Sequence, residues 1–301
     1  MLATYKHVVA LILMSILSQR CVTCTRRTTH SILLPADSIG TKHTILVHRY
    51  APESVKAKKT AYIQASLHAD ELPGMYHLEY VFFNCYLIFS EILAFQGMLV
   101  AHHLIKLLDT ADKLGDILEN ISIVPYANPI GLSQQLLGTQ IGRFSLSTGV
   151  NFNREYRDIG EAVANRIDGK LNEKSDHNVE LIREALIAEI DSNVATRGES
   201  EMKRILYKIA CPCDIVIDLH CDSDAVLHMY TSDRLWPQLS DLAAELKTEC
   251  NLLAPSQGFD SFDEACSCPW AYLADRFPSF PIPMGCESVT VELRGESDVR
   301  I

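Results

Sequence analysis

The chain is short of positive charge. Its 301 residues include 27 Lys and Arg against 38 Asp and Glu, for a formal net charge of −11, and it has no long basic run. Nucleic-acid-binding proteins carry basic patches that neutralise phosphates, so this composition argues against a nucleic-acid partner. An acidic protein that handles an anionic substrate must concentrate its few arginines locally. Arg143, Arg154 and Arg294, which stand near apolar runs, are therefore candidates to bind substrate.

The cysteine pattern offers little support for a structural zinc site or a disulfide framework. Cys211 and Cys213, like Cys266 and Cys268, have C-x-C spacing, whereas structural zinc sites typically use C-x-x-C pairs. A domain of this size can draw its stability from a hydrophobic core and does not need the disulfides that small secreted folds require. We therefore expect mostly free thiols.

The amino-terminal segment, residues 1–24, resembles a secretory signal only in part. It has a Lys6 n-region and an apolar run from Val8 to Leu17, but no Ala-x-Ala cleavage pattern. Two interpretations follow, a signal peptide or an unstructured extension. The protein is accordingly expected to be secreted under the first and cytoplasmic under the second.

Short apolar runs alternate with amphipathic patterns along the rest of the chain, residues 25–301. The runs that predict buried strands are Ala61–Leu67, Ile121–Ala127, Asp214–Leu219 and Ser288–Val291. Apolar residues spaced by three and four predict helices over Leu99–Leu118, Val179–Ile190 and Leu235–Leu246. This alternation predicts one α/β catalytic domain with a mixed, largely parallel central sheet flanked by helices.

A nearly continuous apolar stretch, residues 76–98, does not fit this alternation. It has about the length of a membrane span, but two glutamates, an asparagine and a glutamine interrupt it. Without it, the text HADELPGM would continue directly into the helical pattern LVAHHLIKLLD. We therefore interpret it as an atypical insertion and not as a membrane span.

Metal-type ligands follow two of the predicted strands. The first strand leads into SLHADELPG, in which His68 and Glu71 are separated by two residues, and the third ends in DLHCD with His220. In an open α/β sheet, ligands bind beyond the carboxyl ends of the strands. Two histidines and one carboxylate are a catalytic zinc set that leaves a fourth position to water. The sequence therefore predicts one zinc ion per chain, held by these three residues.

A carboxylate, Glu292, ends the fourth predicted strand in the run SVTVE. A buried, unpaired carboxylate costs several kcal/mol, so Glu292 should face either a water at the metal or a cation. The first option makes it the catalytic base. The second is a structural pair with Arg294, which alternation places on the same face of the strand and which can equally reach the substrate.

Five motifs together resemble a known family. SLHADELPG, ANPIGLSQ, NFNREY, DLHCD and VTVELRGE, in this order, are similar to motifs of the succinylglutamate desuccinylase/aspartoacylase family of the zinc carboxypeptidase superfamily. The resemblance implies a zinc carboxypeptidase-like fold, with His68, Glu71 and His220 as zinc ligands and Glu292 as the base. It extends from about residue 61 to residue 299. Family members usually continue further, so we expect the carboxyl-terminal part to be truncated.

The same resemblance implies substrate-binding roles. Asn153 and Arg154 would grip the carboxylate of the substrate, and Arg143 would polarise the scissile carbonyl. The physical chemistry of a guanidinium and an amide supports the first role, because both donate to a carboxylate in a planar arrangement. The expected substrate is a small anionic acyl-amino acid or a peptide. Deacylation of an N-acyl amino acid leads, with peptide carboxypeptidase action or a catalytically impaired binding module as alternatives.

Four other features have modest expectations. Asp218 is predicted either to orient His220 or to make a structural hydrogen bond, and Cys221 to pack near the metal. His102 and His103 are predicted to lie on a helix surface. The segment DEACSCPW, residues 263–270, is predicted to be a loop that can line the pocket.

Overall fold

The structure, a computed structural model, describes residues 27–52, 55–71, 96–255 and 260–295. Within these residues the chain builds an eight-stranded sheet and a separate two-stranded hairpin. The strands of the sheet are β1 (Thr28–Leu33), β2 (Thr44–Tyr50), β3 (Thr60–Ala65), β4 (Asn120–Val124), β7 (Ile215–Asp222), β8 (Leu227–Ser232), β9 (Cys250–Ala254) and β10 (Glu287–Gly295). The hairpin consists of β5 (Gln135–Leu136) and β6 (Thr139–Gln140).

The sheet is mixed, in the spatial order β1-β2-β4-β3-β7-β10-β8-β9. The four central strands β4, β3, β7 and β10 run parallel to one another, as do β8 and β9. The pairs β1–β2, β2–β4 and β10–β8 are antiparallel. The predicted α/β fold with a mixed, largely parallel sheet is confirmed, and the parallel centre brings the carboxyl ends of β3, β7 and β10 to one edge.

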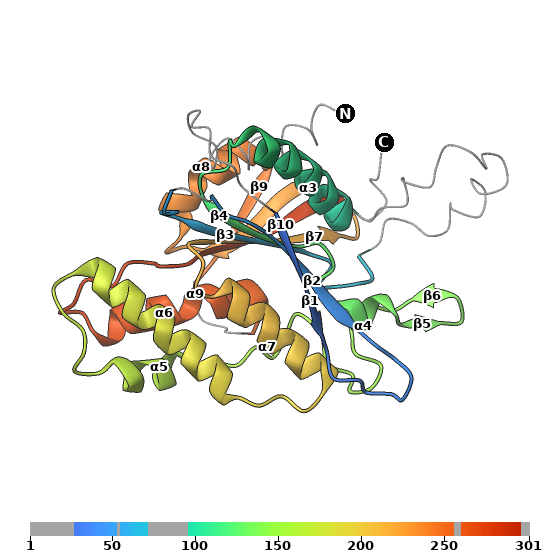
Figure 1. Cartoon of the computed structure of the whole chain (residues 1–301), viewed down its shortest axis with the longest axis horizontal. Coiled ribbons are helices and arrows are strands. Elements are labelled where there is room, and N and C mark those ends of the chain that lie inside the picture. The colour runs from blue at the N-terminus through green and yellow to red at the C-terminus, as the bar shows by residue number, and fades with distance from the viewer. Residues whose placement is uncertain (1–26, 53–54, 72–95, 256–259, 296–301) are drawn as a thin grey trace.

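Helices cover both faces of the sheet (Figure 1). The described helices are α3 (Gln96–Leu114), α4 (Pro129–Leu132), α5 (Gly160–Ile167), α6 (Ser175–Ser192), α7 (Gly198–Ala210), α8 (Trp236–Leu246) and α9 (Phe262–Arg276). α3 and α8 lie on one face, and α5, α6, α7 and α9 lie on the other (Figure 1). Because strand side chains alternate, Tyr62 packs into the core beneath the second group while Ile63 packs beneath the first.

All four predicted strands are present, as β3, β4, β7 and β10, and the three predicted helices are α3, α6 and α8. Helix α3 ends earlier than predicted, because Gly115 follows it with a φ of 71°. Glycine adopts this left-handed conformation without steric cost and commonly stops a helix. His102 and His103 are exposed on α3, as expected.

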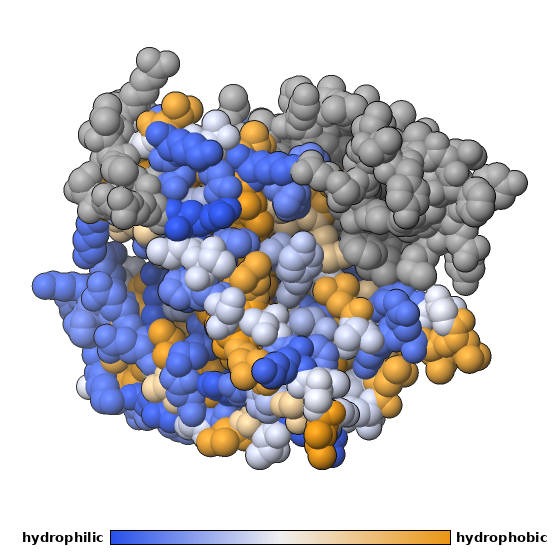
Figure 2. Space-filling view, turned by 45° about the vertical axis from the view of Figure 1, so that its right-hand side comes forward, coloured by the Kyte–Doolittle hydropathy of each residue, from blue (hydrophilic) through white to orange (hydrophobic). Residues whose placement is uncertain are grey.

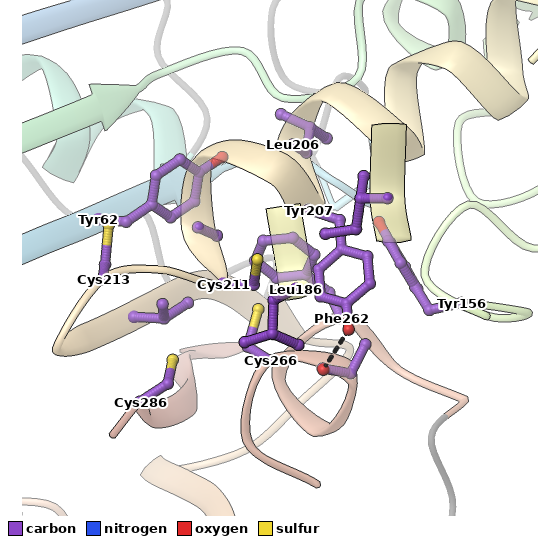
Figure 3. Close-up of a cluster of buried hydrophobic side chains, with 14 of the residues drawn as sticks. Tyr62, Tyr156, Leu186, Leu206, Tyr207, Cys211, Cys213, Phe262, Cys266 and Cys286 are labelled. Atoms are coloured by element: carbon purple, nitrogen blue, oxygen red, sulfur yellow. Dashed lines mark hydrogen bonds between the residues drawn. The ribbon is translucent and has the colours of Figure 1, made fainter. Parts of the chain in front are cut away.

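One predicted loop, residues 263–270, is wrong, because it forms most of helix α9. Pro269 argues against a helix in the sequence, because a proline within a helix lacks the amide that would bond to the carbonyl of Ala265. The Tyr207 hydroxyl donates to that carbonyl instead, over 2.8 Å, from helix α7 (Figure 3). A tertiary contact thus compensates for the proline.

The described cysteines are free thiols, as expected. Cys211, Cys213, Cys266 and Cys286 are buried among aromatic side chains on the face covered by α7 and α9 (Figure 3). Burial raises the pKa of the Cys211 and Cys266 thiols well above their ordinary range. Neutral thiols in this position act as small packing groups.

The two unusual segments of the sequence lie mainly outside the described residues. Residues 1–24 and most of residues 76–98 are in this category, and the last three residues of the second segment belong to α3. Among the helices that the structure describes, none combines the length and apolarity that crossing a membrane requires. On the face in Figure 2, hydrophobic and hydrophilic residues of the described part are interspersed.

Candidate metal centre and its pocket

The candidate centre lies at the carboxyl ends of three neighbouring parallel strands, β3, β7 and β10. Glu292 of β10 stands opposite His220 of β7 in the strand register. After β3 the chain turns at Ser66, whose φ of 66° is left-handed, and leads into His68. Such a conformation costs a non-glycine residue roughly 1–3 kcal/mol and persists where surrounding contacts hold it.

Two buried contacts hold the loop that carries His68. Asn128, from the ANPIG motif, donates its amide to the Leu67 carbonyl over 2.9 Å and accepts from the Gly131 amide over 2.7 Å. The Ala69 amide donates to the Gly142 carbonyl over 3.0 Å. A Cβ at Gly142 would lie 2.2 Å from the Ala69 carbonyl carbon, so only glycine allows this approach of two backbones.

His68, Glu71 and His220 converge at the centre of the site, as predicted. Their ligand atoms lie within 4.8 Å of one another, and all three residues are buried. Nδ1 of His68 is 2.6 Å from one carboxylate oxygen of Glu71, and Nδ1 of His220 is 2.9 Å from the other. Two imidazoles and a carboxylate form a donor set that suits zinc.

The far nitrogen of each imidazole faces an oxygen acceptor. Nε2 of His68 lies 2.8 Å from Oδ1 of Asn151, whose identity as oxygen follows from the Asn153 amide, which donates to it over 2.8 Å. Nε2 of His220 lies 2.9 Å from a carboxylate oxygen of Asp218, in ion-pair contact but not in hydrogen-bond geometry. In a neutral His68 ring the proton therefore belongs on Nε2, and the Nδ1 lone pair points at Glu71. Lone pairs on nitrogen and carboxylate oxygen repel one another at these distances, so a metal ion or a proton between them would stabilise the arrangement.

The electrostatics at this centre favour an ionised Glu71. Burial by itself raises its pKa, but the facing imidazoles of His220 and His68 outweigh burial and hold the pKa well below its ordinary range. Burial lowers the pKa of His220, and the neighbouring carboxylates of Asp218 and Glu71 outweigh it and raise that pKa. Zinc and protons would compete for this centre, because both bind to the same imidazole and carboxylate atoms.

Glu292 borders the centre, and one of its carboxylate oxygens makes no hydrogen bond to the described residues. This oxygen, Oε2, is buried. Burial raises the pKa of Glu292 to about 7, against the opposing effect of the His220 imidazole. A carboxyl with this pKa can both accept and return a proton near neutral pH. The pairing of β10 with β7 shifts between Glu292 and Gly295, so the strict alternation that would place Arg294 beside Glu292 does not hold there.

A cavity of about 510 Å³ opens above the centre. The predicted site residues among those that line it are His68, Glu71, Arg143, Asn153, Arg154, His220 and Glu292. Arg294 is not among them, and its substrate-binding role remains a prediction. Cys221 also lines the cavity, and its amide donates to Glu71 over 3.1 Å, so it packs against the metal-type ligands as expected.

The described residues that line the cavity include two arginines, Arg143 beside the metal-type ligand Glu71 and Arg154 beside Asn153. Arg143 donates to Glu71 over 3.0 Å, and its side chain is 42% exposed. Arg154 donates to the Asn153 carbonyl over 2.7 Å, lies 3.5 Å from Asp260, and is 48% exposed. Asn153 accepts from the Phe262 amide at the start of α9 over 2.8 Å. Both guanidinium groups therefore remain accessible to a ligand in the cavity.

Two solved proteins have a similar fold. A protein from Shewanella amazonensis SB2B, assigned to the succinylglutamate desuccinylase/aspartoacylase family, superposes with a TM-score of 0.70 at 24% identity, over 91% of this chain and 67% of its own. One from Shewanella frigidimarina NCIMB 400, with the same assignment, gives 0.70 at 22% identity, over 92% and 67%. This chain shares their fold. No protein-family model and no curated protein sequence matches it.

Several residues of the site were missed by sequence reasoning. Asn151 contacts His68, and Ser288 and Thr290 line the cavity. Ser288 and Thr290 precede Glu292 by four and two positions on a strand, so the period of two would have placed them on its face. Residues 263–270 were expected to line the pocket, and Asp263, Glu264, Ser267 and Cys268 do line the cavity, although from helix α9 and not from a loop.

Proposed function

We propose that this protein is a zinc-dependent hydrolase that cleaves an amide bond next to a carboxylate, most simply in an N-acyl amino acid. The proposal includes membership of the succinylglutamate desuccinylase/aspartoacylase family, which the sequence motifs and the fold of the two Shewanella proteins support. One observation carries the proposal. Three buried ligand atoms of His68, Glu71 and His220 converge beside Glu292, whose buried Oε2 has no hydrogen-bond partner among the described residues.

The residues of the chain divide the work. His68, Glu71 and His220 would hold zinc, which when bound supplies Lewis acidity to the scissile carbonyl and to water. The Glu292 carboxylate takes the proton of the attacking water and gives it to the amine nitrogen as the carbon–nitrogen bond breaks, so the carboxylate is restored at the end of the cycle. Arg143, at the edge of the centre, faces the cavity and stabilises negative charge on the carbonyl oxygen.

The substrate class follows from the cations of the cavity. The protein carries a net charge of −11, so an anionic substrate needs a local positive charge to bind. Arg154 supplies this charge beside Asn153, and its planar guanidinium matches a carboxylate. We therefore place the free carboxylate of the substrate at Arg154 and the scissile amide between Glu292 and the metal ligands.

The test is a matched substrate panel on the zinc-loaded protein. N-acyl amino acids, the same compounds with the carboxylate amidated, and short peptides with a free carboxyl terminus are assayed side by side. We expect turnover of N-acyl amino acids that falls on amidation. The Glu292→Gln variant, purified in parallel, reports any contaminating hydrolase.

The panel also separates the alternatives. Preferred turnover of peptides would replace deacylation with carboxypeptidase action while leaving the roles of the residues intact. Stoichiometric zinc without turnover of any compound would refute the enzymatic proposal and leave a binding module.

A further inference from the structure

The segment Asn151–Arg154 connects the metal-type ligands to the substrate-binding cations. Its first residue, Asn151, accepts from Nε2 of His68 over 2.8 Å, and Asn153 and Arg154 line the cavity. Moving this short segment would therefore change both the support of a ligand and the position of a guanidinium.

The segment does not hold this shape through regular secondary structure. Asn151 makes an isolated bridge to Phe144, the Arg154 amide closes a turn onto the Asn151 carbonyl over 3.2 Å, and the following residue, Glu155, has a left-handed φ of 60°. A non-glycine residue in this conformation costs roughly 1–3 kcal/mol. Contacts from elsewhere in the fold support this turn, and one of them is the Asp260 carboxylate, which accepts from the Glu155 amide over 2.7 Å.

Lys203 of helix α7 provides such contacts. Its Nζ donates to the Arg154 carbonyl over 2.8 Å and to the Asn151 carbonyl over 3.2 Å, so it bonds to both ends of the segment. Nζ also lies 3.7 Å from Glu199, one turn earlier on α7, which accepts from Thr148 over 2.9 Å. Side chains of helix α7 thus bond to Thr148, just before the segment, and to Asn151 and Arg154 within it.

The burial of Lys203 sets it apart from an ordinary surface lysine. It is 9% exposed, and burial lowers its pKa although the Glu199 carboxylate opposes the shift. A buried ammonium is costly to desolvate and is tolerated when its donors are satisfied. On the same helix, the side chain of Lys208 is 40% exposed and pairs with Asp191 over 2.6 Å. The fold therefore accepts the cost of a buried cation at one position of α7, where it bonds to the carbonyls that flank the pocket residues.

We propose that Lys203 is a positioning residue of the active site: by bonding to the Asn151 and Arg154 carbonyls, it holds Asn151 against His68 and directs Arg154 into the cavity. Its kinetic consequence rests on the proposed function. Lys203 is not among the described residues that line the cavity, so it acts through the segment and chiefly on the binding of the carboxylate of the substrate.

The test compares Lys203→Met, which keeps the aliphatic stem, with Lys208→Met as the matched control on the same helix. Hydrogen exchange of residues 148–156 is measured on the zinc-loaded, unliganded proteins. Faster exchange in this segment is expected for Lys203→Met only. Lys203→Gln, which retains one donor group, serves as the second variant if Lys203→Met does not fold.

Kinetics provide the second measurement, with zinc content determined on each sample. For Lys203→Met we expect KM for a carboxylate-bearing N-acyl amino acid to rise about tenfold with a smaller change in kcat, which marks lost binding and not lost chemistry. For the amidated substrate, kcat/KM should stay within about twofold. In an Arg154→Gln background the effect of Lys203→Met should vanish, because the contact between the Arg154 guanidinium and the carboxylate of the substrate is then already absent.

Three results would overturn the proposal: unchanged exchange of residues 148–156, an equal loss of kcat/KM for both substrates, or additive effects with Arg154→Gln. The last two would indicate general destabilisation. If the wild-type protein hydrolyses none of the compounds, the proposed function fails, and the exchange measurement still decides whether Lys203 holds the segment.

Discussion

Replacing Glu292 with glutamine separates the two roles that this carboxylate can have. Glutamine has nearly the same shape but cannot accept a proton, and Glu292 is not one of the three convergent ligands. Zinc content should therefore stay near one per chain. General acid–base assistance is worth roughly 10²–10⁴-fold, so kcat should fall at least about a hundredfold, equivalent to about 2.7 kcal/mol of transition-state stabilisation.

The Glu292→Gln variant should also change how stability depends on pH, and the sign of that change distinguishes a catalytic base from a structural ion pair. Burial raises the pKa of Glu292 from 4.5 to about 7 in the metal-free folded protein. The folded state thus holds this proton more tightly than the unfolded state does. The associated stability is fully present below pH 4.5 and is lost as pH rises through about 7. A shift of this size amounts to about 3 kcal/mol as an upper bound.

Glutamine does not titrate, so metal-free Glu292→Gln should lose less stability than wild type between pH 5 and pH 8. Urea unfolding of both proteins at these two pH values measures the difference. A structural pair with Arg294 predicts the opposite sign at pH 8, because the variant would lose an ion pair. Retained kcat with bound zinc, together with lower stability at pH 8, would refute the role of Glu292 as base.

Four further predictions follow from contacts in the structure. His220→Ala should abolish most zinc binding measured by elemental analysis, and stoichiometric metal in that variant would exclude it as a ligand. Gly142→Ala should weaken zinc affinity by about 10–100-fold, because its Cβ would displace the backbone of the metal loop, and a competitive chelator titration measures this. Arg154→Gln should raise KM for carboxylate substrates and spare amidated ones; equal effects would remove it from substrate binding. Tyr207→Phe should cost about 1–3 kcal/mol in urea unfolding, since it removes the donor to the Ala265 carbonyl. Tyr156→Phe, which deletes a buried hydroxyl that has no partner in the described part of the chain, should be nearly neutral.

The centre of the sheet was predictable from sequence, and its edges were not. The strands β3, β4, β7 and β10 are buried on both faces, which requires continuous apolar runs that stand out locally. The edge strands β1 and β9 are largely exposed and carry no such run. Their pairing depends on partners far along the chain, so local sequence contained no signal for them.

Helix α9 shows a second limit. Pro269 argues locally against a helix, and only the Tyr207 hydroxyl from α7, which bonds to the Ala265 carbonyl, explains why the helix continues through it. Propensity describes the cost of proline in an isolated helix. Packing and a hydrogen bond from another element decided the outcome here.

The candidate site divides in the same way. The sequence by itself determined the metal-type ligands and the carboxylate, because a parallel sheet gathers the residues at its strand ends, and His68, His220 and Glu292 each follow an apolar run. Only the tertiary structure decided that each histidine faces Glu71 with its Nδ1 atom and that Lys203 donates to the carbonyls of Asn151 and Arg154. These contacts join residues from different elements, and their geometry depends on how helices pack against the sheet, which no local pattern of residues specifies.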